Sequence, residues 1–322
     1  MPTSAAVRAY YSDRFVLPLP AGHRFPMSKY RLLRERCEAA CPGLRLVEAE
    51  AATDGELALA HEPRWIDAVA QGLLSPQEQR EIGFPWSEAM AQRARRSVGA
   101  TIGAARSALI EGEGVAANLA GGTHHAYADK GSGYCVFNDV AVAARLMQAQ
   151  WFRMHRELLR VAVVDLDVHQ GNGTAAIFRD DDTVYTLSVH GARNFPFRKE
   201  ASDLDIELPD GCDDSGYLRA VDQALAALAR QHDAAPFGLA FFLAGADPHE
   251  GDRLGRLRVS FDGLAERDRK VFDACRAWGT PVAVSMAGGY GHDVHDTVGV
   301  HLNTLRAAVR HWQSLHDALR RA

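Results

Sequence analysis

Apolar residues in this chain gather into short continuous runs, and longer helical candidates lie between the runs. Most runs lack the alternation of a half-exposed strand, which is typical of parallel strands covered on both faces. Strands are predicted at residues 7–12, 44–49, 115–120, 160–167, 183–189, 205–209, 238–244 and 281–287. Helices are predicted at 27–41, 56–71, 88–111, 138–158, 215–232, 260–277 and 297–320. The pattern predicts an α/β fold with a mostly parallel sheet of about eight strands flanked by helices.

The alternation of elements continues along the whole chain. Two helices have plausible N-caps, at Asn138-Asp139 and at Asp214-Ser215. No repeat, low-complexity tract or long Gly/Ser/Pro linker divides the 322 residues. Because α/β folds often reach this length as one unit, residues 1–322 are expected to form a single domain.

Composition and charge exclude several classes of protein. Apolar residues at 47% and charged residues at 24% are ordinary globular values. The net charge of −5 provides no overall basic field for a nucleic acid, and no apolar stretch is long enough to span a membrane. The N-terminal sequence lacks the pattern of a secretion signal. Five cysteines without C-x-x-C spacing argue against disulfides or a thiolate zinc site. A cytoplasmic protein is expected.

Polar motifs stand at the ends of five expected strands. GGTHH, DVHQGNG, SVH, GAD and GGY each follow or close one apolar run. In open α/β sheets, ligands bind outside the carboxyl ends of the strands. These motifs, distant in sequence, are therefore expected to meet at one rim of the sheet.

The D-x-H triplet of Asp167 and His169 indicates a metal site. Two carboxylates and one imidazole can hold zinc with a position left for water, which distinguishes a catalytic from a structural zinc. The doublet His124-His125 can move the proton of that water, and the Tyr290 hydroxyl can polarise a carbonyl. An isolated D-x-H more often caps a loop and buries a histidine. The accompanying HH, GAD and GGY motifs favour zinc-dependent amide hydrolysis.

Longer segments carry a family resemblance. GGTHHAYADKGSGYCVFNDVAVAAR, VAVVDLDVHQGNGTAAIF, GADPHEGDRLGRL and AGGYGHD resemble, in this order, the histone deacetylase branch of the arginase–deacetylase superfamily. The likeness covers most of the chain, from Val7 to His301. The H-Q-G-N-G run, with Gln170 and Asn172, and the opening LPLPAGHRFPMSKYRLL are similar to class IV and its bacterial relatives. The resemblance implies the arginase/deacetylase fold, with the active site at the strand carboxyl ends.

The resemblance also implies roles for the site residues. Asp247 would be the third ligand of Zn²⁺, although Fe²⁺ or Co²⁺ can occupy similar nitrogen and oxygen sites. Asp165 would face His124 and favour its imidazolium form. Asn172 would face His125, where much of the family has aspartate. An amide supplies no negative charge, so His125 is expected to be the more available neutral base.

Four further residues are assigned by the same resemblance. Tyr290 would donate a hydrogen bond to the oxyanion of the tetrahedral intermediate. The carbonyl of Gly133 would accept the substrate amide N–H. Tyr134 and Phe195 would form the aromatic walls of an acyl-lysine tunnel. No equivalent of the acidic rim residue that clamps peptides in class I enzymes is evident.

A structural potassium ion is implied beneath the zinc. Its ligands would be the Asp165 carboxylate, the Ser188 hydroxyl and the backbone oxygens of Asp167, His169 and Val189. Buried oxygens that converge under a carboxylate need a cation. A simple hydrogen bond between Ser188 and Asp165 is the alternative.

Together these features predict a zinc amidohydrolase that removes acetyl or longer acyl groups from lysine ε-amines. Its partner would be an acyl-lysine protein or peptide, or an acylated small amine. One alternative is hydrolysis of acetylpolyamines, and another is a catalytically silent protein that binds acyl-lysine. A two-metal ureohydrolase of the arginase type fits less well, because its additional aspartate ligands have no counterparts here. Oligomeric state is not indicated by the sequence.

Overall fold

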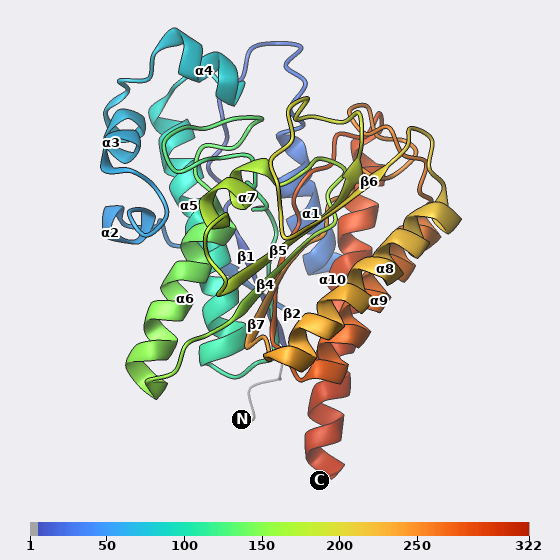
Figure 1. Cartoon of the computed structure of the whole chain (residues 1–322). Coiled ribbons are helices and arrows are strands. Elements are labelled where there is room, and N and C mark those ends of the chain that lie inside the picture. Colours follow the sequence, from blue (N-terminus) through green and yellow to red (C-terminus); the bar gives the residue numbers. More distant parts are fainter. Residues whose placement is uncertain (1–5, 322) are drawn as a thin grey trace.

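A single eight-stranded sheet forms the centre of the molecule in the computed structural model, which describes residues 6–321 (Figure 1). All strands are parallel, in the order β2-β1-β3-β8-β7-β4-β5-β6. The prediction of a mostly parallel sheet is confirmed, and each predicted strand is present. The strands are β1 (Val7–Tyr11), β2 (Leu44–Glu48), β3 (Val115–Asn118), β4 (Val161–Asp165), β5 (Val184–Gly191), β6 (Leu204–Leu208), β7 (Leu239–Leu243) and β8 (Val282–Ser285).

Helices cover both faces of this sheet. One face packs against α1 (Ser28–Ala40), α8 (Asp214–Ala234), α9 (Phe261–Trp278) and α10 (Val294–Arg321), and the other against α5 (Glu88–Ala105) and α6 (Asp139–His155). Figure 1 shows α8, α9 and α10 on one side of the strands and α5 and α6 on the other. In β4, Ala162 and Val164 belong to the first apolar core and Val161 and Val163 to the second. Because successive side chains of a strand point to opposite faces, a continuous apolar run is what two covered faces require.

Short helices account for the main departures from the sequence prediction. The helix expected at 56–71 is two helices, α2 (Asp54–Leu57) and α3 (Pro63–Gln71). Pro63 lacks an N–H and starts α3, so the first helix must end before it. The helix expected at 88–111 ends at Ala105 and continues as the π-helix η1 (Arg106–Ile110). Two helices, α4 (Pro76–Ile82) and α7 (Asn172–Phe178), were not predicted.

The two predicted N-caps have different outcomes. The side chain of Asn138 accepts a hydrogen bond from Ala141 N at 3.0 Å, so this prediction is confirmed. The cap of α8 is Asp213 rather than Asp214, and its carboxylate accepts from Gly216 N at 3.0 Å. Asp214 instead accepts from the backbone N and the hydroxyl of Ser260, at the start of α9. Two adjacent aspartates look alike in sequence, and the contact with α9 decides which one caps.

Other expectations concern the chain as a whole. The single-domain prediction for residues 1–322 includes residues 1–5 and 322, which lie outside the described part, and it stays a prediction. All five cysteines are free, in agreement with the sequence analysis. Within residues 6–321, no helix is both long enough and apolar enough to cross a membrane.

Candidate active site

The polar motifs meet because their strands are neighbours. His124-His125 follow β3, the D-x-H triplet follows β4, and Asp247 and Tyr290 follow β7 and β8. The order β3-β8-β7-β4 places these four strands side by side in the middle of the sheet. Since all four are parallel, their carboxyl ends deliver the motifs to the same edge.

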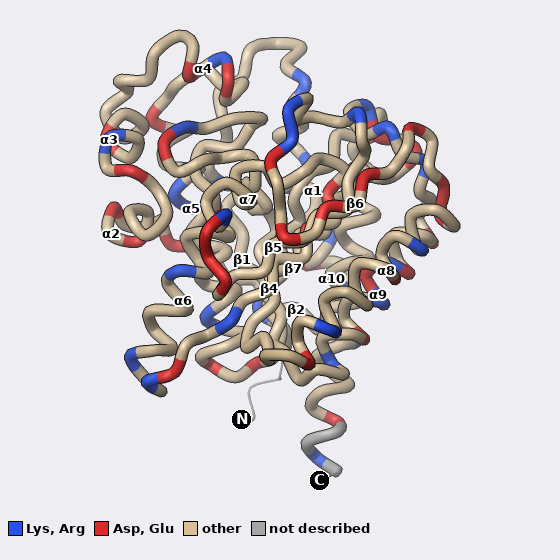
Figure 2. Tube along the Cα trace, viewed as in Figure 1, with Lys and Arg blue, Asp and Glu red and all other residues tan. Residues whose placement is uncertain are grey.

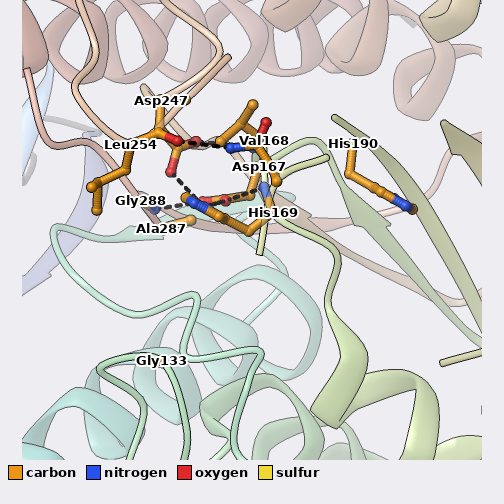
Figure 3. A network of polar contacts seen from close by, with 12 residues as sticks. Gly133, Asp167, Val168, His169, His190, Asp247, Leu254, Ala287 and Gly288 are labelled. Atoms are coloured by element: carbon orange, nitrogen blue, oxygen red, sulfur yellow. Dashed lines mark hydrogen bonds and ion pairs between the residues drawn. The ribbon is translucent and has the colours of Figure 1, made fainter. Parts of the chain in front are cut away.

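Asp167, His169 and Asp247 converge on one point. All three are buried, and their potential ligand atoms lie within 4.8 Å of one another. His169 Nδ1 lies 2.9 Å from Asp167 Oδ1 and 3.2 Å from Asp247 Oδ2. Figure 3 shows the three side chains directed at each other. The structure therefore brings together the three residues expected to ligate a metal.

Backbone N–H groups hold the two carboxylates in place. Asp247 Oδ1 accepts from Val168 N at 2.9 Å, and Asp167 Oδ2 accepts from Gly288 N at 2.7 Å (Figure 3). A Cβ at Gly288 would lie 1.9 Å from Asp247 Oδ2, so only glycine permits this close approach. Among the described residues, the buried Asp247 Oδ2 has no hydrogen-bond partner in acceptable geometry.

The electrostatics of the three residues suit a cation. Burial, together with the neighbouring Asp167 carboxylate, raises the pKa of Asp247 to about 7. Burial lowers the pKa of His169, but the neighbouring Asp167 and Asp247 carboxylates outweigh it and raise that pKa to about 10. The negative potential that raises these two pKa values also favours a divalent cation in place of the bound protons. Two carboxylates and an imidazole fit zinc, and they fit iron or cobalt in the same way.

His124 is paired with a buried carboxylate. Its Nδ1 lies 2.6 Å from Asp165 Oδ2, and Asp165 is the last residue of β4. Burial lowers the pKa of His124, but the Asp165 carboxylate outweighs it and raises the pKa to about 9. The Asp165 carboxylate therefore favours the imidazolium form of His124 at neutral pH.

His125 has a neutral partner instead. Its Nδ1 lies 2.6 Å from Asn172 Oδ1, while Asn172 Nδ2 donates to the Tyr127 hydroxyl at 2.9 Å. Because the amide nitrogen is occupied by Tyr127, the amide oxygen faces the imidazole, and Nδ1 must be the protonated ring nitrogen. Burial and the neighbouring His124 hold the pKa of His125 well below its usual value. His125 is therefore neutral, with Nε2 free to accept a proton.

Tyr127 and Glu200 are residues that the sequence analysis missed. The Tyr127 hydroxyl donates to Glu200 Oε1 at 3.2 Å, and the Glu200 carboxylate pairs with Arg179. Gln170 exchanges two hydrogen bonds with the Glu200 backbone. A tyrosine two residues after the His doublet was the available signal, but Glu200 lies 73 residues further along the chain.

Tyr290 lies beside the metal ligands, with its ring centroid 6.3 Å from that of His169. Its backbone is anchored at both polar atoms, because Tyr290 N donates to Asp252 Oδ2 at 2.6 Å and Arg253 Nε donates to Tyr290 O at 2.9 Å. Burial raises the pKa of Tyr290 well above its usual value. The hydroxyl therefore stays protonated and can donate a hydrogen bond.

A cavity of about 670 Å³ leads from the surface to this site. Gly133, Tyr134 and Phe195 line it together with His125 and Tyr290. The Phe195 ring centroid lies 4.8 Å from that of His125, and a Cβ at Gly133 would lie 2.6 Å from His125 Cδ2. Figure 3 shows Gly133 on a separate loop, across from the three metal-ligand candidates. The residues expected to form an aromatic slot are thus gathered around it.

The residues expected to bind potassium are only partly arranged as the sequence suggested. Asp165 and Ser188 are register partners on β4 and β5. The Ser188 hydroxyl contacts His190 Nδ1 at 2.9 Å, so the alternative hydrogen bond to Asp165 does not form. Val189 belongs to β5, where it pairs with Ile206 of β6. In Figure 3 His190 points away from the metal-ligand candidates. The potassium site stays a prediction.

Lys29 is another residue that the sequence analysis did not single out. This buried side chain reaches the carbonyl oxygens of Ala287 and Gly289, at 3.4 and 3.2 Å. Its ammonium group lies 5.2 Å from the centroid of the Tyr290 ring. Lys29 thereby ties α1 to the loop that carries Tyr290.

Comparisons with known proteins identify relatives of this chain. Residues 23–305 match the model of the histone deacetylase domain. An uncharacterized protein of Picosynechococcus sp. is 44% identical over 300 residues, 92% of this chain and 97% of that protein. Histone deacetylase 2 of Arabidopsis thaliana is 36% identical over 199 residues, 61% of this chain, and the match spans about half (49%) of that protein's length. An HDAC homolog from Aquifex aeolicus has a TM-score of 0.77 at 23% identity, covering 94% of this chain and 84% of that one, which supports the fold.

Proposed function

The chain belongs to the histone deacetylase family, and on that premise we propose that it is a zinc-dependent hydrolase that removes acetyl or longer acyl groups from lysine ε-amines. The single observation that best supports this is the convergence of Asp167, His169 and Asp247 next to two histidines whose pKa values are shifted in opposite directions. Of these residues, His125 and His169 line a cavity whose walls include the aromatic side chains of Tyr134, Phe195 and Tyr290.

Asp167, His169 and Asp247 would hold the metal ion. A bound zinc ion would polarise the acyl carbonyl and lower the pKa of a water molecule. The surrounding side chains would stabilise charge and transfer protons. Asp165 keeps His124 protonated, so that His124 stabilises negative charge as it develops. His125, held neutral, takes a proton from the attacking water through Nε2 and then returns one to the leaving amine.

Substrate orientation would depend on the cavity walls. The Gly133 carbonyl accepts the amide N–H of the substrate, and Tyr134 and Phe195 enclose the methylene stem of the lysine. The Tyr290 hydroxyl donates to the oxygen that becomes negative in the tetrahedral intermediate. A tetrahedral carbon that collapses with loss of the protonated amine yields the carboxylate and free lysine.

Acetylpolyamine hydrolysis, the nearest enzyme alternative, receives less support. Five arginines and one glutamate line the cavity, and a polyamine would place its remaining cationic amines among those arginines. A silent binding protein also receives less support, because both histidines and Tyr290 are in place around the metal-ligand candidates.

The test is metal analysis of the purified protein combined with a screen of acyl-lysine chain lengths and acetylpolyamines. We expect about one zinc ion per chain, loss of activity to chelators, inhibition by hydroxamates, and turnover of acyl-lysine. Full activity in a metal-free sample would overturn the zinc mechanism. A zinc-loaded protein that is inert towards every acyl-lysine would favour the binding protein instead.

A further inference from the structure

The outer end of the cavity is strongly basic although the chain as a whole is acidic. Arginines from four separate segments line it, and Glu81 is the one carboxylate in the same lining among the described residues. The arginines are Arg24 before α1, Arg80 on α4, Arg193 after β5, and Arg253 and Arg256 after β7. In Figure 2, blue segments gather on the loops at the upper end of the view, near α4 and above β6. The net charge of −5 gives no hint of this basic mouth.

Most of this positive charge is uncompensated. Arg193 and Arg256 share a single carboxylate, Asp210, at 3.8 and 3.1 Å. No described carboxylate lies within ion-pair distance of Arg24, Arg80 or Arg253, which are all exposed. Glu81 accepts a hydrogen bond from Gln77 at 2.9 Å rather than from an arginine.

A cavity mouth of this kind selects by charge. Guanidinium groups match the geometry of carboxylates, and a cleft lined by one sign of charge concentrates ligands of the opposite sign. When a lysine stem enters the cavity, its peptide backbone stays outside. Neighbouring residues advance only about 3.3–3.6 Å each along an extended peptide, so those within two positions of the lysine stay over the mouth.

We infer that the substrate is an acyl-lysine flanked by acidic residues, whose carboxylates are bound by the arginines of the mouth. This inference rests on the proposed function and deepens it by adding a substrate class. The four arginines other than Arg253 would act on substrate capture rather than on the bond-breaking step, since they are exposed at the outer end of the cavity, whereas Arg253 also holds the Tyr290 carbonyl.

The test compares three acetyl-lysine peptides of equal length that differ only in their flanking residues: acidic, neutral or basic. With the zinc-loaded full chain at low salt, kcat/KM for the acidic peptide should exceed that for the neutral one by roughly tenfold. The basic peptide should be the poorest substrate. At about 0.5 M salt the differences should shrink, because exposed charges are screened over a few ångströms.

Two variants are expected to change the preference for the acidic peptide in opposite directions. Asp210→Asn frees Arg193 and Arg256 and should raise the ratio of kcat/KM for the acidic over the neutral peptide. Arg80→Gln combined with Arg193→Gln should lower that ratio, because two of the five arginines of the mouth lose their charge. The matched control is Arg153→Gln, an exposed arginine at the C-terminal end of α6, which should leave the ratio as in the unmodified protein.

The outcomes separate the two proposals. Equal turnover of the three peptides, or a preference for the basic one, would overturn the charge selection while the deacylase function stands. A ratio that does not respond to Asp210→Asn and to the double arginine variant would also overturn it. Zinc-loaded protein that hydrolyses none of the peptides would count against the proposed function itself, and the substrate class would fall with it.

Discussion

The floor of the cavity and its mouth are built in opposite ways. At the floor, the carboxylates of Asp165, Asp167 and Asp247 are buried and bound by backbone N–H groups and histidines. At the mouth, exposed arginines stand on loops and on the short helix α4. Buried charges need fixed partners, whereas exposed charges are screened by water and salt. If the proposals hold, substitutions at the floor should affect the chemical step more severely than substitutions at the mouth affect substrate selection.

The largest effect is expected at the floor. Asp167→Ala or His169→Ala should abolish both metal binding and turnover, because each removes one of three ligands. Metal content and kcat/KM are measured on the same sample. His292→Ala is the matched control, since this histidine is exposed and two residues beyond Tyr290, and it should keep its zinc. A His169→Ala protein that retains zinc and turnover would show that the ligands lie elsewhere.

Tyr290→Phe should lower the rate of the chemical step while leaving metal binding intact. Loss of the hydroxyl should lower kcat by roughly 10²–10³, because it removes one donor to the oxyanion. Zinc content should be unchanged, since Tyr290 is not among the metal-ligand candidates. Near-normal turnover in the phenylalanine variant would assign the oxyanion to another donor.

Asn172→Asp should change the pH dependence rather than abolish activity. The new carboxylate beside His125 raises the pKa of an imidazole that burial and His124 now hold well below its usual value. His125 must be neutral to accept a proton, so the acidic limb of kcat/KM against pH should move to higher pH. Rate is then lost on the acidic side and retained above the limb.

Tyr127→Phe is the matched control for that experiment. It removes a partner of the same amide without adding charge, so it should not move the acidic limb to higher pH. Both profiles are compared at equal zinc content. An unmoved limb in Asn172→Asp would show that residue 172 does not tune the base.

The smallest effect is expected at the mouth. Glu81→Gln removes the one described carboxylate of the cavity lining and should raise kcat/KM for an acidic peptide by roughly two- to fivefold at low salt, the range typical of exposed charge pairs. The value of kcat should not change, because capture alone is affected. A change in kcat of similar size, insensitive to salt, would place Glu81 in the chemical step and erase the distinction between mouth and floor.

The strands and the motifs at their ends were predictable from the sequence, because both depend on local patterns. The run of residues 161–164 is apolar throughout because both faces of β4 are covered, whichever strands lie beside it. Asp167 and His169 are two residues apart, so the turn after β4 is enough to direct both side chains towards the same point. The prediction of one helix at 56–71 was wrong because Pro63 begins a new helix inside that range. The α4 helix was missed although Ser75 and Glu78 form a capping box.

Only the tertiary structure decided which residues complete the site. Tyr127 orients the Asn172 amide, and Asp252 anchors the Tyr290 backbone. No sequence motif around Tyr127 or Asp252 indicates these contacts. The basic mouth depends on the packing of α4 and three loops around one cavity. The net charge of the whole chain does not reveal such a local cluster of arginines. Local periodicity determines what a segment becomes, since its own residues supply the apolar faces. The strand order β3-β8-β7-β4 and the loops at its end depend on long-range pairing, so the contacts across the site appear only when the sheet has formed.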